Sequence, residues 1–358
     1  MSDIYRVAVV GCGGMGRSHS RAWSAHPRSN VVAVADIDEA AAHRVAEEFA
    51  VPAIYTDYKK MLAEHTPDIV SIPTWQGVRA EVTIEAARAG AKGIFGEKPI
   101  ASALGEADDM IDACEKAGAK LAIGHQNRFA PTVNLVRQLV ADGAIGEPTL
   151  VHHRAKPNAG LLNTGTHVID GWRYMLSDPQ PAWVIGNTSR TTDRWERRTH
   201  CEDLCMGLVC FDNGVRGVYE GDLPEPDARA PVVYGTQGQI RTDKAGVVPN
   251  GNLWLQGQNH AGWRELIPPP VGVTQYDEFI AWLDGEIDSH RSRATEARAT
   301  LEVMMAIYES LRTKNVVNLP MTTRECPLDL MIADGTLPVE VEGRYDLRAP
   351  FPEQEVAG

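Results

Sequence analysis

Long hydrophobic runs are missing from this 358-residue sequence. No uninterrupted apolar stretch approaches the roughly 20 residues that a membrane-spanning helix needs, so we expect no membrane segment. The N-terminus, MSDIYRVAVVGCGG, has no charged segment followed by a long apolar stretch, which argues against a signal peptide. The sequence therefore predicts a cytoplasmic protein without a membrane partner.

Basic charge and cysteine are also scarce. The chain has 35 Lys and Arg against 48 Asp and Glu, a net charge of -13, so it would repel phosphate backbones and we expect no nucleic-acid partner. The six cysteines are scattered and form no CxxC pair. We therefore predict no metal site, and thiols that stay reduced in the cytosol.

The first 125 residues alternate between short Val- and Ile-rich strands and helices of about a dozen residues. This alternation is typical of a parallel sheet that helices cover on both faces. Residues 1–125 are therefore predicted to form a doubly wound α/β domain of the Rossmann type. We expect its strands at residues 5–10, 30–36, 53–56, 68–73, 93–97 and 120–126.

A glycine-rich turn follows the first predicted strand and opens a helix. Gly11, Gly13 and Gly16 form the pattern G-x-G-x-x-G, and Asp36 follows twenty residues later at the end of the second strand. In this context the pattern predicts a dinucleotide site, where the turn meets the pyrophosphate and the carboxylate accepts hydrogen bonds from ribose hydroxyls. A carboxylate would repel a 2′-phosphate, so Asp36 favours NAD over NADP. The turn also includes Cys12, Gly14 and Met15.

The texture changes after residue 125, where strand-like runs follow one another with few helices. Phe211–Gly214, FDNG, has the composition of a hairpin turn. We predict an α+β domain over residues 126–320 with a large, mostly antiparallel sheet and one face open to a partner. Two late helices complete this part, and the proline-punctuated tail over residues 321–358 is expected to lie across the surface.

The sequence resembles the glucose–fructose oxidoreductase / inositol dehydrogenase / MocA family. The resemblance extends from about residue 5 to about residue 320, in the family's order, with E-K-P at Glu97–Pro99 as its most specific motif. The matching pieces read VVGCGGMG, VADIDE, SIPT, GEKPIA, HQNRFAP, GAIGEP, GTHVIDGWR and FDNG. The resemblance implies an NAD-dependent oxidoreductase acting on a secondary hydroxyl of a sugar, glycoside or cyclic polyol. It also implies a homodimer or homotetramer assembled through the open sheet face.

The resemblance places Lys98 in the active site, with His167 as a second catalytic candidate. The family commonly has an aspartate four residues before this histidine, where this chain has Asn163. An amide cannot carry a proton or stabilise an imidazolium by charge, but it can orient a substrate hydroxyl. We expect Lys98 to orient the reactive hydroxyl and His167 to be the final base. A second departure is Arg79, where many members have a histidine.

Further site residues are predicted from position along the chain. Trp75 could pack on the cofactor or wall the sugar, and a plain core tryptophan is an equal alternative. Cofactor contacts are also expected from Thr74, Glu97 and Lys98. For each of Asn127, Arg128, Arg154, Lys156 and Trp172, a surface or interdomain ion pair is at least as good an interpretation. The substrate candidates are Lys98, Asn127, Arg128, Arg154, Lys156, Asn163, Thr166, His167 and Trp172.

Two alternatives to a dehydrogenase stay open. The change to Asn163 is compatible with a regulator that binds NAD and a sugar without turnover, although retention of Lys98 and His167 argues against it. The other alternative is an enzyme that uses transient oxidation while NAD stays bound.

Overall fold

The computed structural model describes residues 4–155, 160–221, 229–242, 253–257 and 262–348. The chain divides into two compact units. The first comprises Met1–Ala101, Gly105–His125 and Val273–Arg298, and the second Ser102–Leu104, Gln126–Gly272 and Ala299–Gly358. One division between the units falls between His125 and Gln126, and the chain returns to the first unit over residues 273–298.

The first unit contains the six-stranded parallel sheet that the sequence predicts, in the order β3-β2-β1-β4-β5-β6. Its order reverses beside β1, which puts the carboxyl ends of β1 and β4 next to each other at the switch point where doubly wound folds bind ligands. The strands are β1 (Tyr5–Val10), β2 (Ser29–Ala35), β3 (Ile54–Tyr55), β4 (Ile69–Ile72), β5 (Gly93–Gly96) and β6 (Lys120–Ile123).

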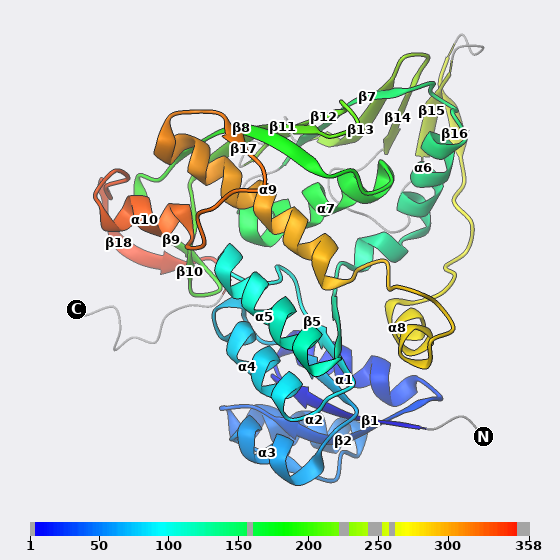
Figure 1. Cartoon of the computed structure of the whole chain (residues 1–358), viewed down its shortest axis with the longest axis vertical. Helices are drawn as coiled ribbons and strands as arrows, with labels where there is room; N and C mark the ends of the chain where they lie inside the picture. The colour runs from blue at the N-terminus through cyan, green and yellow to red at the C-terminus, as the bar shows by residue number, and fades with distance from the viewer. Residues whose placement is uncertain (1–3, 156–159, 222–228, 243–252, 258–261, 349–358) are drawn as a thin grey trace. The chain divides into compact units, whose positions relative to one another are not determined.

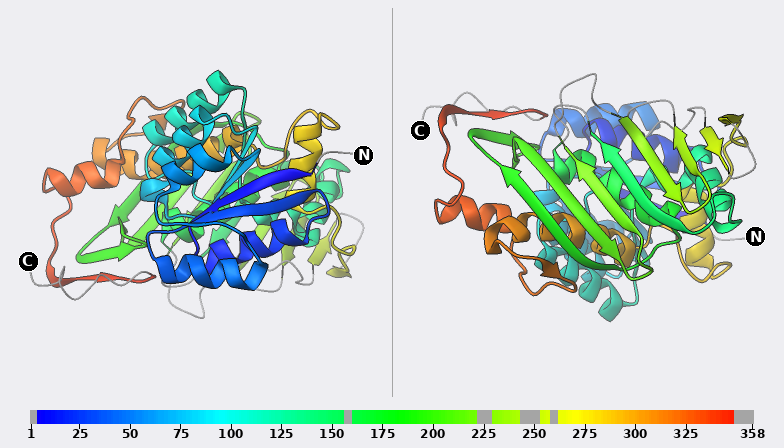
Figure 2. Two further views of the ribbon diagram at one scale, coloured as in Figure 1. Left: turned by 90° about the horizontal axis from the view of Figure 1, so that it is seen from below. Right: turned by 90° about the horizontal axis from the view of Figure 1, so that it is seen from above.

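Helices cover both faces of this sheet (Figures 1 and 2). α1 and α2 pack together on one face, and α4 and α5 lie on the other. α8 joins the side of α1, where Phe279 and Tyr276 contact the Trp23 ring edge-on. The helices are α1 (Gly14–Ala25), α2 (Glu39–Phe49), α3 (Tyr58–His65), α4 (Gln76–Arg88), α5 (Leu104–Ala117) and α8 (Gln275–Asp284).

The second unit is built on a nine-stranded sheet in the order β16-β15-β14-β13-β7-β12-β11-β8-β17. The pairing is antiparallel except between β7 and β12, which are parallel. The predicted hairpin at FDNG joins β11 to β12, with Gly214 at φ 81°. The strands are β7 (Pro148–Arg154), β8 (Pro181–Ser189), β11 (Leu204–Phe211), β12 (Arg216–Glu220), β13 (Arg229–Gly235), β14 (Gln239–Thr242), β15 (Leu253–Gln256), β16 (Arg264–Leu266) and β17 (Val317–Asn318).

Two helices, α7 (Thr166–Met175) and α9 (Ala294–Thr313), cover one face of the nine-stranded sheet (Figure 1). Glycines let them approach closely, because a Cβ at Gly186 or Gly207 would lie 2.7 or 2.6 Å from Ile307 of α9. A Cβ at Gly217 would lie 2.8 Å from Trp172 of α7. Figure 2 shows the opposite face of the sheet uncovered by any described helix.

The segment after residue 320, expected to lie across the surface, contains a helix and a strand of its own. It contains α10 (Pro327–Ala333), whose Leu328 and Met331 are fully buried, and β18 (Val341–Asp346). β18 pairs with β9 (Thr192–Glu196), which pairs with β10 (Thr199–His200), to form a separate three-stranded sheet. Among the described helices, none is long and apolar enough to cross a bilayer.

Candidate active site

The glycine turn after β1 has the shape that a dinucleotide site requires. Gly11 has φ +102°, which strongly favours glycine, and a Cβ at Gly16 would lie only 2.0 Å from the Gly11 carbonyl oxygen. Gly13 is different, because a Cβ there would meet nothing within 4 Å. The first and third glycines are therefore required by the turn itself, whereas Gly13 leaves open space on its surface.

The start of α1 and the end of β2 complete this turn. Gly13 is the N-cap of α1 and offers no side-chain acceptor to the first helical amides, and the first turn carries no acidic residue. These amides favour an anion. The Asp36 carboxylate accepts hydrogen bonds from the amides of Cys12, at 2.6 Å, and Asp38, at 2.9 Å, which hold it against the turn. The residues present therefore fit the pyrophosphate and ribose of NAD.

Cys12 and Met15 differ in how they can contribute to this turn. Cys12 is buried, and burial, together with the negative charges of Asp36 and Asp38, raises the pKa of its thiol to about 12. It is therefore a neutral packing residue whose backbone contributes to the site. Met15 is 37% exposed at the start of α1 and can offer its side chain to a ligand.

Lys98 follows β5 and stands beside a buried acid, Glu97. The Glu97 carboxylate lies 3.0 Å from His19 Nε2, and the second ring nitrogen of His19 lies 2.8 Å from Ser71 Oγ. The Lys98 amide donates to the other Glu97 oxygen at 3.2 Å. Burial would raise the pKa of Glu97, but the hydrogen bond and charge of His19, with the charges of Arg79 and Lys98, lower it to about 2. Glu97 is therefore a structural anion beneath Lys98, and its side chain does not face the surface.

The direction of each hydrogen bond in this network follows from donor and acceptor counts. Trp23 Nε1 can only donate, and it lies 3.0 Å from Ser71 Oγ. Ser71 Oγ therefore accepts from Trp23 and also lies beside His19 Nδ1, while His19 Nε2 can donate to Glu97. Trp23, Ser71, His19, Glu97 and the Lys98 amide thus each have a polar partner in this network. Neither His19 nor Ser71 was predicted from the sequence.

Arg79 fixes the segment that carries Lys98. This guanidinium is buried, and it donates to the carbonyl oxygens of Pro99 and Thr74. One side chain of α4 therefore ties the residue after Lys98 to the turn after β4. Trp75, the N-cap of α4, is 41% exposed, so it is not a plain core residue.

His167 lies in the first turn of α7 and is half-buried. The Asn127 side-chain nitrogen lies 3.2 Å from His167 Nδ1. Asn127 itself is buried, in the short helix η1 (Gln126–Phe129). Two of the predicted site residues are thus brought together within the second unit, and one imidazole nitrogen is held by an amide.

Asn163 lies in a π-helical turn, η2 (Leu161–Gly165), that runs directly into α7. π-helical turns are rare and occur frequently at functional sites. The Asn163 side-chain nitrogen lies 2.6 Å from Glu196 Oε1, so the amide donates to a carboxylate. Thr166, the first residue of α7, is 1% exposed and has little surface for a substrate.

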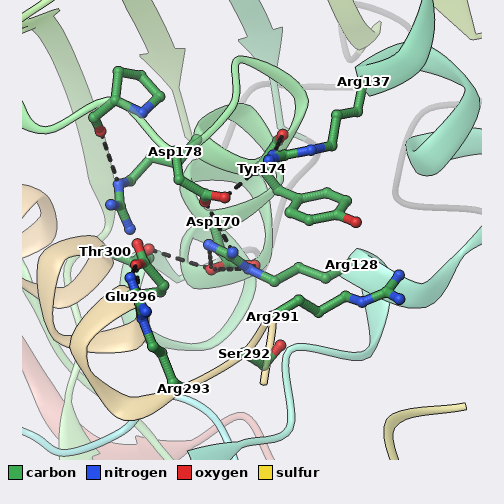
Figure 3. Close-up of polar contacts among 12 residues, drawn as sticks. Arg128, Arg137, Asp170, Tyr174, Asp178, Arg291, Ser292, Arg293, Glu296 and Thr300 are labelled. Atoms are coloured by element: carbon green, nitrogen blue, oxygen red, sulfur yellow. Dashed lines mark hydrogen bonds and ion pairs between the residues drawn. The ribbon is translucent and has the colours of Figure 1, made fainter. Parts of the chain in front are cut away.

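Two other substrate candidates lie in the interior of the second unit. Arg128 is fully buried, and its guanidinium donates to both carboxylate oxygens of Asp170, at 2.8 to 3.0 Å, and pairs with Asp178 at 2.8 Å (Figure 3). Trp172 is also fully buried and packs against Gly217 of the sheet. The guanidinium is occupied by two carboxylates and the indole is covered by the sheet, so we assign both residues to the structure.

Arg154 lies on the opposite face of the sheet from α7. It pairs with Glu220 at 3.1 Å, and His152 contacts the same carboxylate oxygen. His153 between them is buried on the face that α7 covers, because successive strand residues point to opposite faces. The ion-pair interpretation therefore fits Arg154, and Lys156 lies outside the described residues.

The site residues are divided between the two units. The glycine turn, Asp36, Thr74, Trp75 and Lys98 belong to the first, and Asn127, Asn163 and His167 to the second.

Comparison with known proteins identifies related sequences along most of the chain. A sequence model described as "Oxidoreductase family, NAD-binding Rossmann fold", GFO_IDH_MocA, matches residues 5–125, and the GFO/IDH/MocA C-terminal domain matches residues 133–241. A D-apiose dehydrogenase from Paraburkholderia graminis is 24% identical over 369 residues, covering 93% of this chain and 94% of that protein. An uncharacterized oxidoreductase of Bacillus subtilis, YrbE, is 33% identical over 256 residues, or 66% of this chain and 73% of that protein. Among solved structures, an aldose-aldose oxidoreductase from Caulobacter crescentus complexed with glycerol is 22% identical with a TM-score of 0.76, covering 88% of this chain and all of that one (100%).

Proposed function

Since this chain belongs to the GFO/IDH/MocA oxidoreductase family, we propose that it is an NAD-dependent dehydrogenase of a secondary hydroxyl on a sugar, glycoside or cyclic polyol. The observation that carries this proposal is that two features occur in the same chain. The first is a glycine turn with Asp36 that fits NAD, and the second is an E-K-P segment whose lysine is positioned by buried partners. The similarity to a D-apiose dehydrogenase supports a sugar or a related polyol as the substrate class.

The cofactor would be held by the first unit. The amides at the start of α1 would meet the pyrophosphate, Asp36 would accept from the ribose hydroxyls, and Thr74 and Trp75 would lie toward the nicotinamide half. When bound, the nicotinamide supplies the hydride acceptor or donor. No arginine follows Asp36 directly, which favours NAD over NADP.

Lys98 and His167 are proposed to handle the hydroxyl and its proton. Lys98 would orient the reactive oxygen with its ammonium, and the anionic Glu97 beneath it would favour that charged form. Asn127 contacts His167 Nδ1, and with the amide oxygen turned to accept from Nδ1–H, Nε2 of a neutral ring can take the hydroxyl proton in alcohol oxidation. The imidazolium formed in that step can return the proton to the substrate oxygen in carbonyl reduction. The same pair can therefore serve both directions.

The test is a screen of cyclic polyols, hexoses, pentoses and glycosides for growth of NADH absorbance, followed by Lys98→Met. We expect one class to respond, and the variant to lose at least about a hundredfold in kcat while NAD affinity falls by less than about tenfold, as for removal of a group that contacts the reacting atoms. Near-full turnover by the variant would refute the role of Lys98. Tight NAD binding with no response from any compound would favour a regulator, and keto-sugar formation without net NADH would favour transient oxidation.

We propose that the protein assembles into a homodimer or homotetramer through the open face of the nine-stranded sheet. The strand residues that point away from α7 and α9 include large apolar side chains with substantial exposure, namely Ile185 at 44%, Leu204 at 42% and Met206 at 45%. A group of exposed apolar side chains on one face of a sheet indicates a surface that contacts another protein chain. Light scattering would give the number of subunits. Met206→Lys places a charge on this face and should reduce the number of subunits in the assembly.

We also propose a cytoplasmic location. None of the six cysteines, all of which lie in the described ranges, forms a disulfide, and five of them are buried. Reduced thiols are typical of a reducing compartment, where disulfides do not persist.

A further inference from the structure

Two buried carboxylates from other parts of the second unit accept hydrogen bonds from the turn that precedes α7. Glu202 is fully buried and accepts from the Leu161 amide at 2.7 Å and from the Tyr308 hydroxyl at 2.6 Å. Glu196 is the last residue of β9 and is 4% exposed. Its Oε1 accepts from Asn163 at 2.6 Å and from Arg348 Nε at 3.2 Å.

Gly160 allows this approach. A Cβ at Gly160 would lie 2.4 Å from Glu196 Oε2, so only glycine leaves room for the carboxylate against the start of the turn. The Gly160 carbonyl also accepts from the amides of Asn163, at 3.1 Å, and Thr164, at 2.8 Å. Both the backbone and the side chain of Asn163 are therefore held at fixed points.

The carboxylate also decides which way the Asn163 amide faces. Glu196 is an acceptor only, so the Asn163 NH2 group must point toward it and Oδ1 must point away from it. An amide bonded to another amide or to water would have no such constraint. The half-buried Asn163 thus has a defined acceptor on the side of its amide that faces away from Glu196.

We infer that Glu196 is a positioning residue for substrate binding: it orients Asn163 so that Oδ1 is a fixed, neutral acceptor for a hydroxyl of the polyol. This inference rests on the proposed function, because the hydroxyl belongs to the proposed substrate class. It adds to that function a specificity element from β9, which lies 33 residues along the chain from Asn163. A substrate hydroxyl that donates to Oδ1 is required, and an analogue lacking that hydroxyl would gain nothing from the contact.

Exchanging the amide and the carboxylate across the pair provides the experiment. Asn163→Asp would place two carboxylates in contact, and their repulsion would turn the new side chain away from Glu196 until one of them is protonated. Glu196→Gln in the same chain would restore a donor–acceptor pair in the opposite direction. We expect Asn163→Asp to lower kcat/KM about a hundredfold, with partial recovery at acidic pH, and the double variant to return to within about tenfold of the wild type.

Glu196→Ala tests the positioning role separately. Without the acceptor the Asn163 amide loses the contact that fixes its orientation toward residue 196, so KM for the substrate should rise about tenfold while kcat and NAD affinity change little. Glu342→Gln is the matched control, since this carboxylate is exposed on β18. Equal kcat/KM for Asn163→Asp and the double variant, or an unchanged KM in Glu196→Ala, would overturn the inference.

Thermal unfolding separates failure of this inference from failure of the proposed function. A wild type that binds NAD but oxidises no sugar or polyol would refute the function. The melting temperatures of the wild type, Asn163→Asp, Glu196→Gln and the double variant would still report whether residues 163 and 196 are coupled. Coupling in melting temperature without coupling in KM or in the pH profile would make Glu196 purely structural and would also overturn the inference.

Discussion

Glu97→Gln is predicted to change how the stability of the protein depends on pH. The substitution keeps the shape of the side chain and an oxygen that can accept from His19, but it removes the negative charge and the titration. In the folded wild type the pKa of Glu97 is lowered to about 2 from an ordinary 4.5, after the opposing effect of burial has been overcome by His19, Arg79 and Lys98. The folded state therefore binds the proton less readily than the unfolded state does.

The sign and the magnitude of the effect follow from this difference. A lowered pKa contributes stability that is fully present above pH 4.5 and is lost as the pH falls through the folded value. The shift from 4.5 to about 2 corresponds to about 3 kcal/mol. The free energy of unfolding of the wild type relative to Glu97→Gln should be constant above about pH 5 and should fall by about that amount toward pH 2.

Urea unfolding of both proteins at a series of pH values measures this difference, in which the contributions of most other carboxylates cancel. Glu47→Gln, an exposed carboxylate on α2, is the matched control, and its difference from the wild type should not follow this curve. A difference between wild type and Glu97→Gln that stays constant from pH 6 to the lowest pH at which both fold would refute the buried anion beneath Lys98.

Two further predictions concern residues that hold the site. Arg128→Met leaves Asp170 buried without its cation and should lower the free energy of unfolding by about 3–5 kcal/mol in chemical unfolding. The double variant Arg128→Met with Asp170→Leu should lose less stability. Equal losses in the two variants would contradict the ion-pair role. Gly16→Ala forces a Cβ to within 2.0 Å of the Gly11 carbonyl oxygen, so calorimetric titration should show at least tenfold weaker NAD binding. Gly90→Asn is the control, because Gly90 lies at a helix end with φ +88°, and this variant should bind NAD with the affinity of the wild type.

The first unit was predictable because its signals are local. Each strand is a continuous apolar run, and the roles of Gly11 and Gly16 follow from the strand–turn–helix order. The resemblance also predicted the lysine of E-K-P as a site residue, but the sequence did not predict the side chains that surround its segment. Arginine is usually exposed, and a lone histidine can be either buried or exposed, so the sequence did not predict that Arg79 and His19 are buried. Their burial depends on how α4 and α1 pack on the sheet.

The second unit was predictable in class and less so in detail. The alternation of β11 and the FDNG turn predicted antiparallel hairpins, but the parallel pairing of β7 with β12 links segments more than sixty residues apart. Arg128 and Trp172 were placed in the site because they lie close in sequence to His167 and Asn127. A helix turns neighbouring residues to different sides, and these two side chains point into the core. Glu196 had no sequence signal at all, since its contact with Asn163 depends on the path of a distant hairpin.

The turn between β9 and β10 consists of Arg197 and Arg198, both with positive φ, at 54° and 61°. Their amides donate to the carboxylate of Asp346 on β18, which compensates a conformation that arginine seldom adopts. A truncated gene product that stops before residue 341 would lack this cap as well as Arg348, and the strand end that carries Glu196 would lose its anchor. For anyone engineering this protein, the carboxyl-terminal segment thus supports the strand end that carries Glu196, and an affinity tag is better fused to the other end.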